Sequence, residues 1–452
     1  MGRNGQPLRV TVIGIGYLGL THAVCMADLG HQVLAIDVDA EKIAKAARGE
    51  TPFFEPGLEP LLRKNLDAGR LQFTDSWDEI GEFGDVHFIC VGTPQMKDGS
   101  GSADLRYVFG AAEALAPHLN RATLVIGKST VPVGTARQVI ARLHALAPAG
   151  AQVEFAFNPE FLREGYAVQD SLTPDRIVFG VTSDSAEELM REVYATPLAS
   201  GIPSLTMDLE TAELVKVAAN SFLATKISFI NVMAEMCEAS GADVLKLADA
   251  IGIDERIGRK FLSPGLGFGG GCLPKDIRAF KSTAAERGVD SLVDLLTTVD
   301  NINLGRRDRV IDLAREVLSS AAPGGDLAGK RVAVFGAAFK PNSDDIRDSP
   351  SLAISARLAD LGAIVTVHDP VAMPNAAKAR PDLRYADTVH EAAEGAELVL
   401  HLTEWTDYRA IDPVALARIV ANPVLIDGRC TLDAANWRQA GWTVLVPGRP
   451  QP

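Results

Sequence analysis

Apolar runs alternate with helical patterns through the first part of the chain. The pattern at residues 20–29 predicts a helix that ends at Gly30. Continuous apolar stretches predict buried strands at residues 10–13, 32–37, 86–91, 123–127, 155–158 and 177–180. Regular alternation of strands and helices is typical of a parallel sheet that is covered on both faces.

A long segment without glycine or proline follows, between Pro203 and Gly241. Apolar residues recur along it at helical spacing: Leu214, Val217, Ala218, Phe222, Ile227 and Ile230. At about 1.5 Å per residue, such a helix approaches about 50 Å. We therefore expect it to join two lobes.

The last third repeats the α/β theme. A helix is expected at residues 351–361, and strands are expected at residues 330–336, 364–369, 397–402 and 424–427. The fold class that this predicts is α/β, with two Rossmann-like doubly wound domains joined by a long central helix and a small helical domain. The expected domains span residues 1–202, 203–320 and 321–452, and residues 321–326 (AAPGGD) are the expected linker.

Composition narrows the function classes. The chain has 452 residues, 47% hydrophobic and 23% charged, as in ordinary globular proteins. A net charge of −14 argues against a nucleic-acid partner. Five cysteines without metal-ligand spacing argue against structural zinc and indicate a reducing compartment. The sequence shows neither a signal peptide nor an obvious membrane span, so we expect a cytoplasmic protein.

Residues 14–19 (GIGYLG) join the first strand to the first helix, and the second strand ends at Asp37. This is the dinucleotide-binding fingerprint in its required context. Gly14 is expected to form the tight turn, Gly16 to let the pyrophosphate approach, and Gly19 to let the helix pack on the strand. Asp37 is expected to accept hydrogen bonds from ribose hydroxyls and to repel a 2′-phosphate. The sequence therefore predicts NAD rather than NADP.

Residues 267–276 (GFGGGCLPKD) surround the candidate nucleophile, Cys272. The glycines allow a ligand to approach closely, and Pro274 suits a helix start. A cysteine at a helix N-terminus, next to Lys275, is favoured as thiolate. Asp276 lies one helical turn beyond Cys272. The alternative is a glycine-rich turn that holds an inert buried cysteine.

Other polar residues follow strands or share a helix face. Thr93 and Thr130 come after strands, where ligands bind in doubly wound sheets, although either could be a helix N-cap. Glu160 and Glu164 flank Arg163, and the alternative for them is a solvated loop with an internal ion pair.

Lys216 and Asn220 lie one turn apart on the predicted long helix. The basic cluster of Arg256, Arg259 and Lys260 is a candidate phosphate seat in this acidic chain. A reactive thiol with NAD indicates aldehyde oxidation through a thioester.

Six motifs together resemble the UDP-glucose/GDP-mannose dehydrogenase family over nearly the whole chain. They are residues 14–19 (GIGYLG), 129–134 (STVPVG), 158–165 (NPEFLREG), 216–220 (KVAAN), 267–276 (GFGGGCLPKD) and 339–348 (FKPNSDDIRD). Residues 158–165 with 174–178 (PDRIV) are most similar to the members that oxidise UDP-glucose. The resemblance implies oxidation of the C6 alcohol of the sugar to a carboxylate with two NAD⁺ and one water, and no metal.

The resemblance also implies roles for individual residues. The implied catalytic residues are Cys272 as nucleophile, Lys216 with Asn220 for oxyanions, Asp276 with Thr130 for the water or as base, and Glu160 as acid or base on the thioester. The implied cofactor contacts are Gly14, Gly16, Tyr17, Leu18, Gly19, Asp37, Thr93, Thr130, Glu164, Lys275 and Arg347. The implied UDP-sugar contacts are Phe161, Leu162, Glu164, Lys216, Asn220, Arg256, Phe261, Leu262, Gly269, Phe339, Lys340 and Arg429. Arg256 would reach the neighbouring subunit, which implies a homodimer, or a higher homo-oligomer, built on the long helix.

The sequence is compatible with three alternatives. The substrate could be another sugar nucleotide, GDP-mannose or a UDP-N-acetylamino sugar, because Ser263 stands where some relatives have a lysine. The chain could be a non-catalytic sensor of NAD or sugar nucleotide, although a sensor has no use for the thiol. It could also be a hydroxyacid-type dehydrogenase that yields one NADH.

Overall fold

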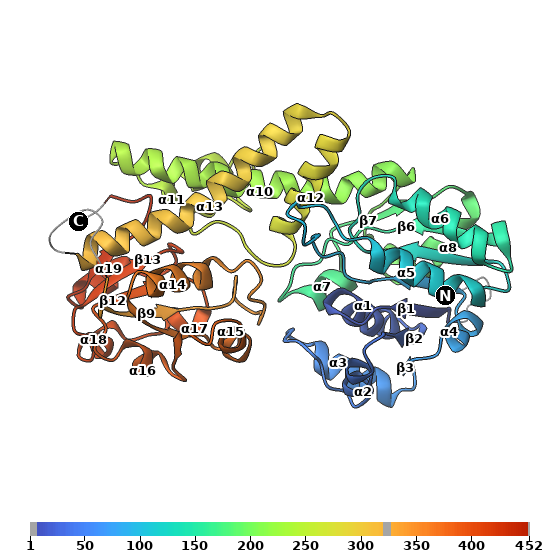
Figure 1. Cartoon of the computed structure of the whole chain (residues 1–452), viewed down its shortest axis with the longest axis horizontal. Coiled ribbons are helices and arrows are strands. Elements are labelled where there is room, and N and C mark those ends of the chain that lie inside the picture. The colour runs from blue at the N-terminus through green and yellow to red at the C-terminus, as the bar shows by residue number, and fades with distance from the viewer. Residues whose placement is uncertain (1–6, 320–326, 451–452) are drawn as a thin grey trace. The chain divides into compact units, whose positions relative to one another are not determined.

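The computed structural model describes residues 7–319 and 327–450 (Figure 1). It divides into two units, Met1–Ala219 with Arg278–Gly288, and Asn220–Ile277 with Val289–Pro452. The expected linker at residues 321–326 lies outside the described residues.

The first unit is built on an eight-stranded sheet, drawn in blue to green in Figure 1, with the order β3-β2-β1-β4-β5-β6-β7-β8. All neighbours pair in parallel except β6 and β7. The strands are β1 Arg9–Ile13, β2 Gln32–Ile36, β3 Leu71–Thr74, β4 Val86–Ile89, β5 Thr123–Gly127, β6 Val153–Phe157, β7 Ile177–Gly180 and β8 Ser204–Met207. The order reverses between β1 and β4, which makes that point the switch point of a doubly wound sheet.

Alternating side chains of the strands fill a separate core on each face of this sheet. Val10 and Val12 pack into one core with α1, α3 and α8, whereas Ile13 packs into the other with α4, α5 and α6. The helices of this unit are α1 Tyr17–Asp28, α2 Ala40–Ala47, α3 Leu58–Asp67, α4 Trp77–Phe83, α5 Arg106–Leu115, α6 Thr135–Leu146, α7 Ala167–Leu172, α8 Asp184–Val193 and α9 Ala195–Ala199, with short 3-10 turns at Ala116–His118 and Gly150–Gln152.

The second unit holds a six-stranded parallel sheet in the order β11-β10-β9-β12-β13-β14, drawn in orange to red (Figure 1). Its strands are β9 Arg331–Phe335, β10 Ile364–His368, β11 Arg384–Tyr385, β12 Leu398–His401, β13 Val424–Asp427 and β14 Thr443–Leu445. Its helices are α11 Val244–Gly252, α13 Asp290–Leu318, α14 Pro350–Asp360, α15 Met373–Ala379, α16 Val389–Ala393, α17 Thr406–Arg409, α18 Pro413–Ala417 and α19 Ala434–Gln439. The two sheets have the same winding, so the prediction of two doubly wound domains is confirmed.

Two helices run from one unit into the other, α10 (Leu209–Ser240) and α12 (Leu273–Glu286). The long helix was predicted from residue 204, but residues 204–207 form the edge strand β8 and the helix begins at Leu209. Its 32 residues span about 48 Å at about 1.5 Å per residue.

Helix α10 also corrects the expectation that no segment is apolar enough to span a membrane. By length and composition alone it passes that test, with a mean hydropathy of 1.3 in its most apolar window. Of that window, 44% is buried inside the structure, and α10 carries the buried polar side chains of Glu213, Lys216 and Asn220. These are features of a core helix rather than of a lipid-facing one.

Candidate active site

The dinucleotide turn has the geometry that the sequence predicts. Gly14 has φ +91°, and a Cβ on Gly19 would lie 1.7 Å from the Gly14 carbonyl oxygen, so helix and turn are in direct contact there. A Cβ on Gly16 would meet no protein atom within 4 Å. The protein therefore leaves space at Gly16, beside the N-terminus of α1, where a pyrophosphate binds in this type of turn.

Asp37 keeps hydrogen-bonding capacity for a ligand. Its Oδ2 accepts from the Ile15 N–H at 2.8 Å, and its Oδ1 accepts from the Asp39 N–H at 3.0 Å. A carboxylate has about four acceptor sites, so about two remain for ribose hydroxyls. Turn and acid together fit the adenosine half of NAD.

The matching acid of the second unit, Asp369, is saturated by the protein. Its Oδ2 accepts from Ala337 N at 2.7 Å, Ala338 N at 3.0 Å and Trp405 Nε1 at 3.1 Å. Its Oδ1 accepts from the N–H groups of Val371 at 3.0 Å and Ala372 at 2.8 Å. Five donors fill a carboxylate completely, so this switch point does not offer a ribose the group that Asp37 offers.

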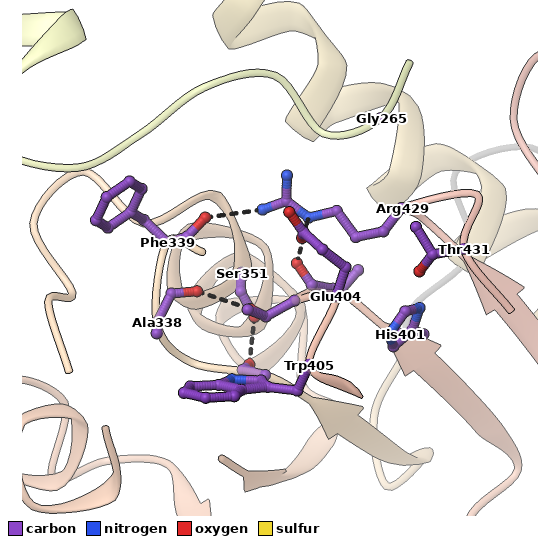
Figure 2. Close-up of polar contacts among 12 residues, drawn as sticks. Gly265, Ala338, Phe339, Ser351, His401, Glu404, Trp405, Arg429 and Thr431 are labelled. Carbon is purple, nitrogen blue, oxygen red and sulfur yellow. Dashed lines mark hydrogen bonds and ion pairs between the residues drawn. The ribbon is translucent and has the colours of Figure 1, made fainter. Parts of the chain in front are cut away.

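Arg429 lies above the switch point of the second sheet (Figure 2). Its guanidinium donates to the carbonyls of Leu402 at 2.7 Å and Phe339 at 3.1 Å, and pairs with Glu404 at 3.1 Å. Its own backbone N–H donates to the buried Asp427 at 3.1 Å, whose other oxygen accepts from the N–H groups that follow it. Burial would raise the pKa of Asp427, but the His401 hydrogen bond and the surrounding N–H groups outweigh it and lower that pKa.

The Cys272 loop is held by two helices of its own unit. Asn303 on α13 receives the Phe268 N–H at 2.6 Å and donates to the Phe268 carbonyl at 3.0 Å. Asn231 on α10 receives the Gly265 N–H at 2.9 Å, and buried Arg306 donates to the Gly265 carbonyl at 3.2 Å. The loop is therefore a pre-formed element rather than a loose connection.

The glycines of this loop serve protein packing. A Cβ on Gly269 would lie 2.4 Å from the Asp348 carbonyl oxygen, and one on Gly270 would lie 2.6 Å from the Phe339 ring. On Gly271 it would lie 2.2 Å from the Arg347 guanidinium carbon. The structure gives these three glycines a packing reason, because residues 339–348 approach them closely, and the approach of a ligand to this loop stays a prediction.

Cys272 precedes the first residue of α12, and its carbonyl accepts the Asp276 N–H at 2.9 Å. Of the five cysteines, all in the described part of the chain, Cys272 is the exposed one. Burial raises the pKa of the Cys25 and Cys90 thiols to about 12, and it also raises the pKa values of Cys237 and Cys430. Cys272 is therefore the thiol that a ligand can reach.

Asn220 on α10 contacts Asp276, which lies in the first turn of α12 after Cys272. Asn220 Nδ2 donates to Asp276 Oδ2 at 2.7 Å, and Lys275 Nζ pairs with Asp276 Oδ1 at 2.7 Å. Asp276 is buried, so its charge is matched by Lys275 and its orientation is fixed by Asn220.

In the first unit, Glu160 lies in a loop after β6. Its Oε1 accepts from the N–H groups of Phe161 at 2.7 Å and Leu162 at 2.8 Å, and its Oε2 pairs with buried Lys128 at 3.0 Å. Burial would raise the pKa of Glu160, but Lys128, with the Leu162 N–H and the more distant charge of Lys216, outweighs burial and lowers it. The Phe161 ring lies 5.6 Å from Lys216 Nζ and 3.8 Å from the Arg176 guanidinium.

Several local alternatives are resolved. Neither threonine is an N-cap, because the N-caps of α5 and α6 are Leu105 and Gly134. In the 158–165 loop, Arg163 pairs with Asp170 at 2.7 Å and Glu160 pairs with Lys128 at 3.0 Å, so both side chains have ionic partners outside the loop. In the basic cluster, Arg256 pairs with Asp254 at 2.6 Å and Arg259 with Asp249 at 2.6 Å, so both charges are partly matched within the chain.

The remaining implied substrate contacts lie in the second unit. Phe261 is one of four non-glycine residues with positive φ in the described part of the chain, at +65°, and it precedes buried Leu262. Lys340 Nζ lies 5.3 Å from the Phe339 ring centroid. Among the described residues, no group of three or more His, Cys, Asp and Glu side chains is placed to hold a metal ion.

Two residues of the site were not among those predicted. Lys128 directly follows β5, which is the signal that could have identified it. Glu55 receives the Tyr17 hydroxyl and the N–H groups of Gly165 and Ala167, both at 2.7 Å, and so ties the 158–165 loop to the dinucleotide turn. No local sequence pattern marks Glu55, because its partners are far away in the chain.

Comparison with known proteins gives the same outline. Three family models match, described as the NAD binding domain, the central domain and the UDP binding domain of the UDP-glucose/GDP-mannose dehydrogenase family, at residues 8–198, 210–304 and 333–434. A UDP-glucose 6-dehydrogenase of Rhizobium meliloti is 43% identical over 445 residues, which cover 98% of this chain and 100% of that protein.

Two solved structures are similar over nearly their whole length. A UDP-glucose dehydrogenase from Pyrobaculum islandicum has a TM-score of 0.89 and 37% identity, with 100% of both chains covered. A UDP-D-ManNAc dehydrogenase from Pyrococcus horikoshii has a TM-score of 0.85 and 26% identity, with 98% of this chain and 100% of that one covered.

Proposed function

The chain belongs to the UDP-glucose/GDP-mannose dehydrogenase family, and from that membership we propose that it oxidises UDP-glucose to UDP-glucuronate with NAD. It is an NAD-dependent oxidoreductase. The observation that carries the choice of substrate is 43% identity over 98% of the chain to a UDP-glucose 6-dehydrogenase. The exposed Cys272 at the start of α12 supports the full oxidation to the acid, because an alcohol-to-aldehyde step needs no thiol.

NAD, when bound, accepts a hydride in each of two oxidation steps. Gly16 leaves room for its pyrophosphate, and Asp37 keeps acceptor sites for its ribose. The acceptor sites of Asp369 are all used by protein donors, so it has none for the ribose of a second NAD. This supports the second lobe as the binding site of the UDP group.

The chain's own groups perform the rest of the chemistry. Cys272 attacks the C6 aldehyde and, after the second oxidation, holds the sugar as a thioester. Lys216 and Asn220, one turn apart on α10, stabilise oxygen atoms that gain negative charge. Asp276 and Thr130 orient the water or act as base, and Glu160 acts on the thioester step.

We propose three functional domains. Residues 1–202 bind NAD, residues 203–320 form the dimer interface and carry catalytic residues, and residues 321–452 bind the UDP-sugar. Localisation in the cytoplasm is part of the same proposal. It fits the presence of the exposed Cys272, which works as a reduced thiol.

A homodimer built on α10 completes the proposal. Phe222, Phe229 and Met236 recur every seven residues and are 66%, 48% and 60% exposed. Such a stripe of large apolar side chains is the pattern of a helix–helix interface. Phe229→Asp is expected to shift the protein from dimer to monomer in sedimentation velocity, whereas the control Glu238→Gln keeps the dimer. A monomeric wild type would refute it.

The oxidation of a UDP-N-acetylamino sugar is the alternative that one observation favours, because the UDP-D-ManNAc dehydrogenase structure has a TM-score of 0.85 with this chain, against 0.53 for a GDP-mannose dehydrogenase structure. Ser263, at the position of a lysine in some relatives, bears on the same choice. NADH absorbance with a panel of UDP-glucose, UDP-N-acetylmannosamine and GDP-mannose separates the candidates. UDP-glucose is expected to react fastest, and a faster reaction with either rival would overturn our choice.

The stoichiometry tests the reaction itself. We expect two NADH per UDP-glucose, because the aldehyde stays on the enzyme until it is an acid. Cys272→Ser is expected to stop turnover at a stalled or covalent species, which intact-mass spectrometry detects. A yield of one NADH per sugar, or full turnover by the serine variant, would contradict the thioester mechanism.

A further inference from the structure

Lys128 is a buried cation in the loop region of the first sheet. It directly follows β5, and Asn158 directly follows the neighbouring strand β6, so the paired strand ends place the two side chains together. Lys128 Nζ donates to Asn158 Oδ1 at 2.9 Å and to the Tyr194 hydroxyl at 3.4 Å, and it pairs with Glu160 Oε2 at 3.0 Å.

These three contacts match the three donors of an ammonium group. The acceptors are fixed in turn: Asn158 Nδ2 donates to the Val178 carbonyl at 2.9 Å, and the Tyr194 hydroxyl donates to Asn158 Oδ1 at 2.5 Å. The Asn158 amide and the Tyr194 hydroxyl therefore present acceptors to Lys128. This arrangement fits a protonated lysine and is poorly suited to a neutral one.

Glu160 has one acceptor site left. Its Oε1 is used by two loop N–H groups, and one site of Oε2 is used by Lys128. Of about four acceptor sites on a carboxylate, the last is therefore on Oε2. The Glu160 side chain keeps 17% of its surface exposed against 6% for Lys128, so water reaches the carboxylate but hardly the ammonium.

We propose that Lys128 is a positioning residue that holds Glu160 as a carboxylate, so that Glu160 acts on the thioester as proton acceptor and not as proton donor. This proposal rests on the proposed function. It goes further by naming Lys128 as the residue that sets the charge state of Glu160 and leaves Oε2 as its accepting atom.

The step balances in atoms and charge. Glu160 Oε2 takes a proton from water while the water oxygen bonds to the acyl carbon of the thioester. The tetrahedral oxyanion then collapses, the carbon–sulfur bond breaks, and Cys272 leaves as thiolate. The proton on Glu160 passes to solvent, which restores the carboxylate beside Lys128.

Other titratable groups also lie near Glu160 and Lys128, and their charges could influence the protonation of Glu160. Lys216 adds a second positive charge toward Glu160. The remaining titratable neighbours that interact with Glu160 or Lys128 are Tyr194, Cys90, Cys25 and His22. Burial raises the pKa values of the tyrosine and both cysteines, and it lowers that of His22, so these four are neutral across the working range. The charges that decide the state of Glu160 are therefore those of the two lysines.

The test measures how fast the Cys272 acyl adduct decays as pH changes, in a single turnover with UDP-glucose and excess NAD, by rapid quench and intact-mass spectrometry. In the wild type we expect decay to slow only at or below the ordinary glutamate pKa of about 4.3. A wild-type decay that already slows on acidification near neutral pH would overturn the proposal, without any variant.

Lys128→Met removes the charge and keeps the length of the side chain. An opposite charge at this range lowers a carboxyl pKa by about 1–3 units. Without Lys128, we therefore expect the acid limb, which is the pH range where adduct decay slows on acidification, to lie about 1–3 pH units higher. At alkaline pH, decay should recover to the wild-type rate. A loss of decay rate that is the same at every pH would show a merely structural role and overturn the proposal.

Three controls accompany this variant. Lys128→Arg keeps the charge and is expected to keep the wild-type limb. Tyr194→Phe removes a neutral neighbour of Lys128, and its limb should not move. If Lys128→Met melts too early to assay, Lys128→Met with Glu160→Gln is expected to regain melting temperature, because no unpaired buried charge remains, and to hold the adduct at all pH values. Rapid decay in that double variant would overturn the role of Glu160.

If UDP-glucose yields no adduct and fewer than two NADH, the proposed function fails. If the adduct forms and two NADH appear, but Lys128→Met leaves the acid limb where it was, only the role of Lys128 fails.

Discussion

Asp37 and Asp369 stand at matching places in the two sheets, each directly after the second strand of its lobe. Asp37 receives one N–H on each oxygen and keeps room for a ribose. Asp369 receives five donors, including the Trp405 indole, and has no room. The same residue type at the same point of the same topology therefore keeps acceptor sites for a ligand in one lobe and is used up by the protein in the other.

The glycine turns after the first strand of each lobe also differ, because one leaves space for a ligand and the other is filled by protein atoms. In the first lobe, Gly16 faces open space and Gly19 lies against the turn itself. In the second, a Cβ on Gly336 would lie 2.3 Å from Thr403 Oγ1, and the chain continues through Phe339 and Lys340 for a longer stretch before α14 begins at Pro350. A shared fold therefore does not predict a shared ligand, and the local hydrogen bonds do.

The largest expected effect comes from adding one carbon at Gly19. In Gly19→Ala the new Cβ would be 1.7 Å from the Gly14 carbonyl oxygen and 3.1 Å from Cys90 Cβ, so helix and turn must separate. Overpacking of this kind costs about 1–3 kcal/mol of folding free energy or more. We expect a lower melting temperature together with loss of measurable NAD binding by calorimetry.

Gly16→Ala is the matched control for that change. The new Cβ meets no protein atom, and the backbone at φ −69°, ψ −167° accepts alanine. The melting temperature without ligand should stay unchanged while NAD affinity falls about tenfold or more, since that space is needed by the pyrophosphate. Equal melting losses in both variants would contradict the distinction between packing and ligand space.

Much of this comparison follows from sequence patterns. The order strand, glycine turn, helix, strand and acid identified the first lobe, and the repeat of strands identified the second. The edges were less visible, because β3 and β11 have four residues and two residues. Strand β11 is too short for an apolar run, polar residues interrupt the apolar ones in β3 (LQFT), and no glycine or proline separates β8 from the long helix.

In the candidate site, residues within one motif are predictable from the sequence, whereas residues with distant partners are not. Cys272, Lys216, Asn220 and Asp276 lie in two compact motifs, so residue spacing makes them candidates and the family resemblance implies their roles. Lys128 and Glu55 act through partners that are 30 and more than 100 positions away, at the ends of neighbouring strands or across a loop. One of the five hydrogen bonds that Asp369 accepts likewise comes from Trp405, 36 positions further along the chain. Such pairings depend on strand register, which the sequence does not display.

A smaller effect separates the two aspartates. Asp37→Asn is expected to weaken NAD binding by about 10–100-fold, because hydrogen bonds from a ligand to a charged acceptor contribute about 1.5–3 kcal/mol. It should also reduce the preference for NAD over NADP, since the repelling charge is gone. Binding calorimetry with both cofactors measures the two changes, and the melting temperature should barely move.

Asp369→Asn should do the reverse. Its amide turns an N–H₂ group toward backbone donors, and the buried N–H groups left without an acceptor cost about 1–3 kcal/mol of stability. The second lobe should therefore melt earlier, while NAD affinity in the native protein stays at the wild-type value. If Asp369→Asn weakened NAD binding as much as Asp37→Asn did, both acids would be serving the cofactor, and the contrast between a ligand acid and a structural acid would be lost.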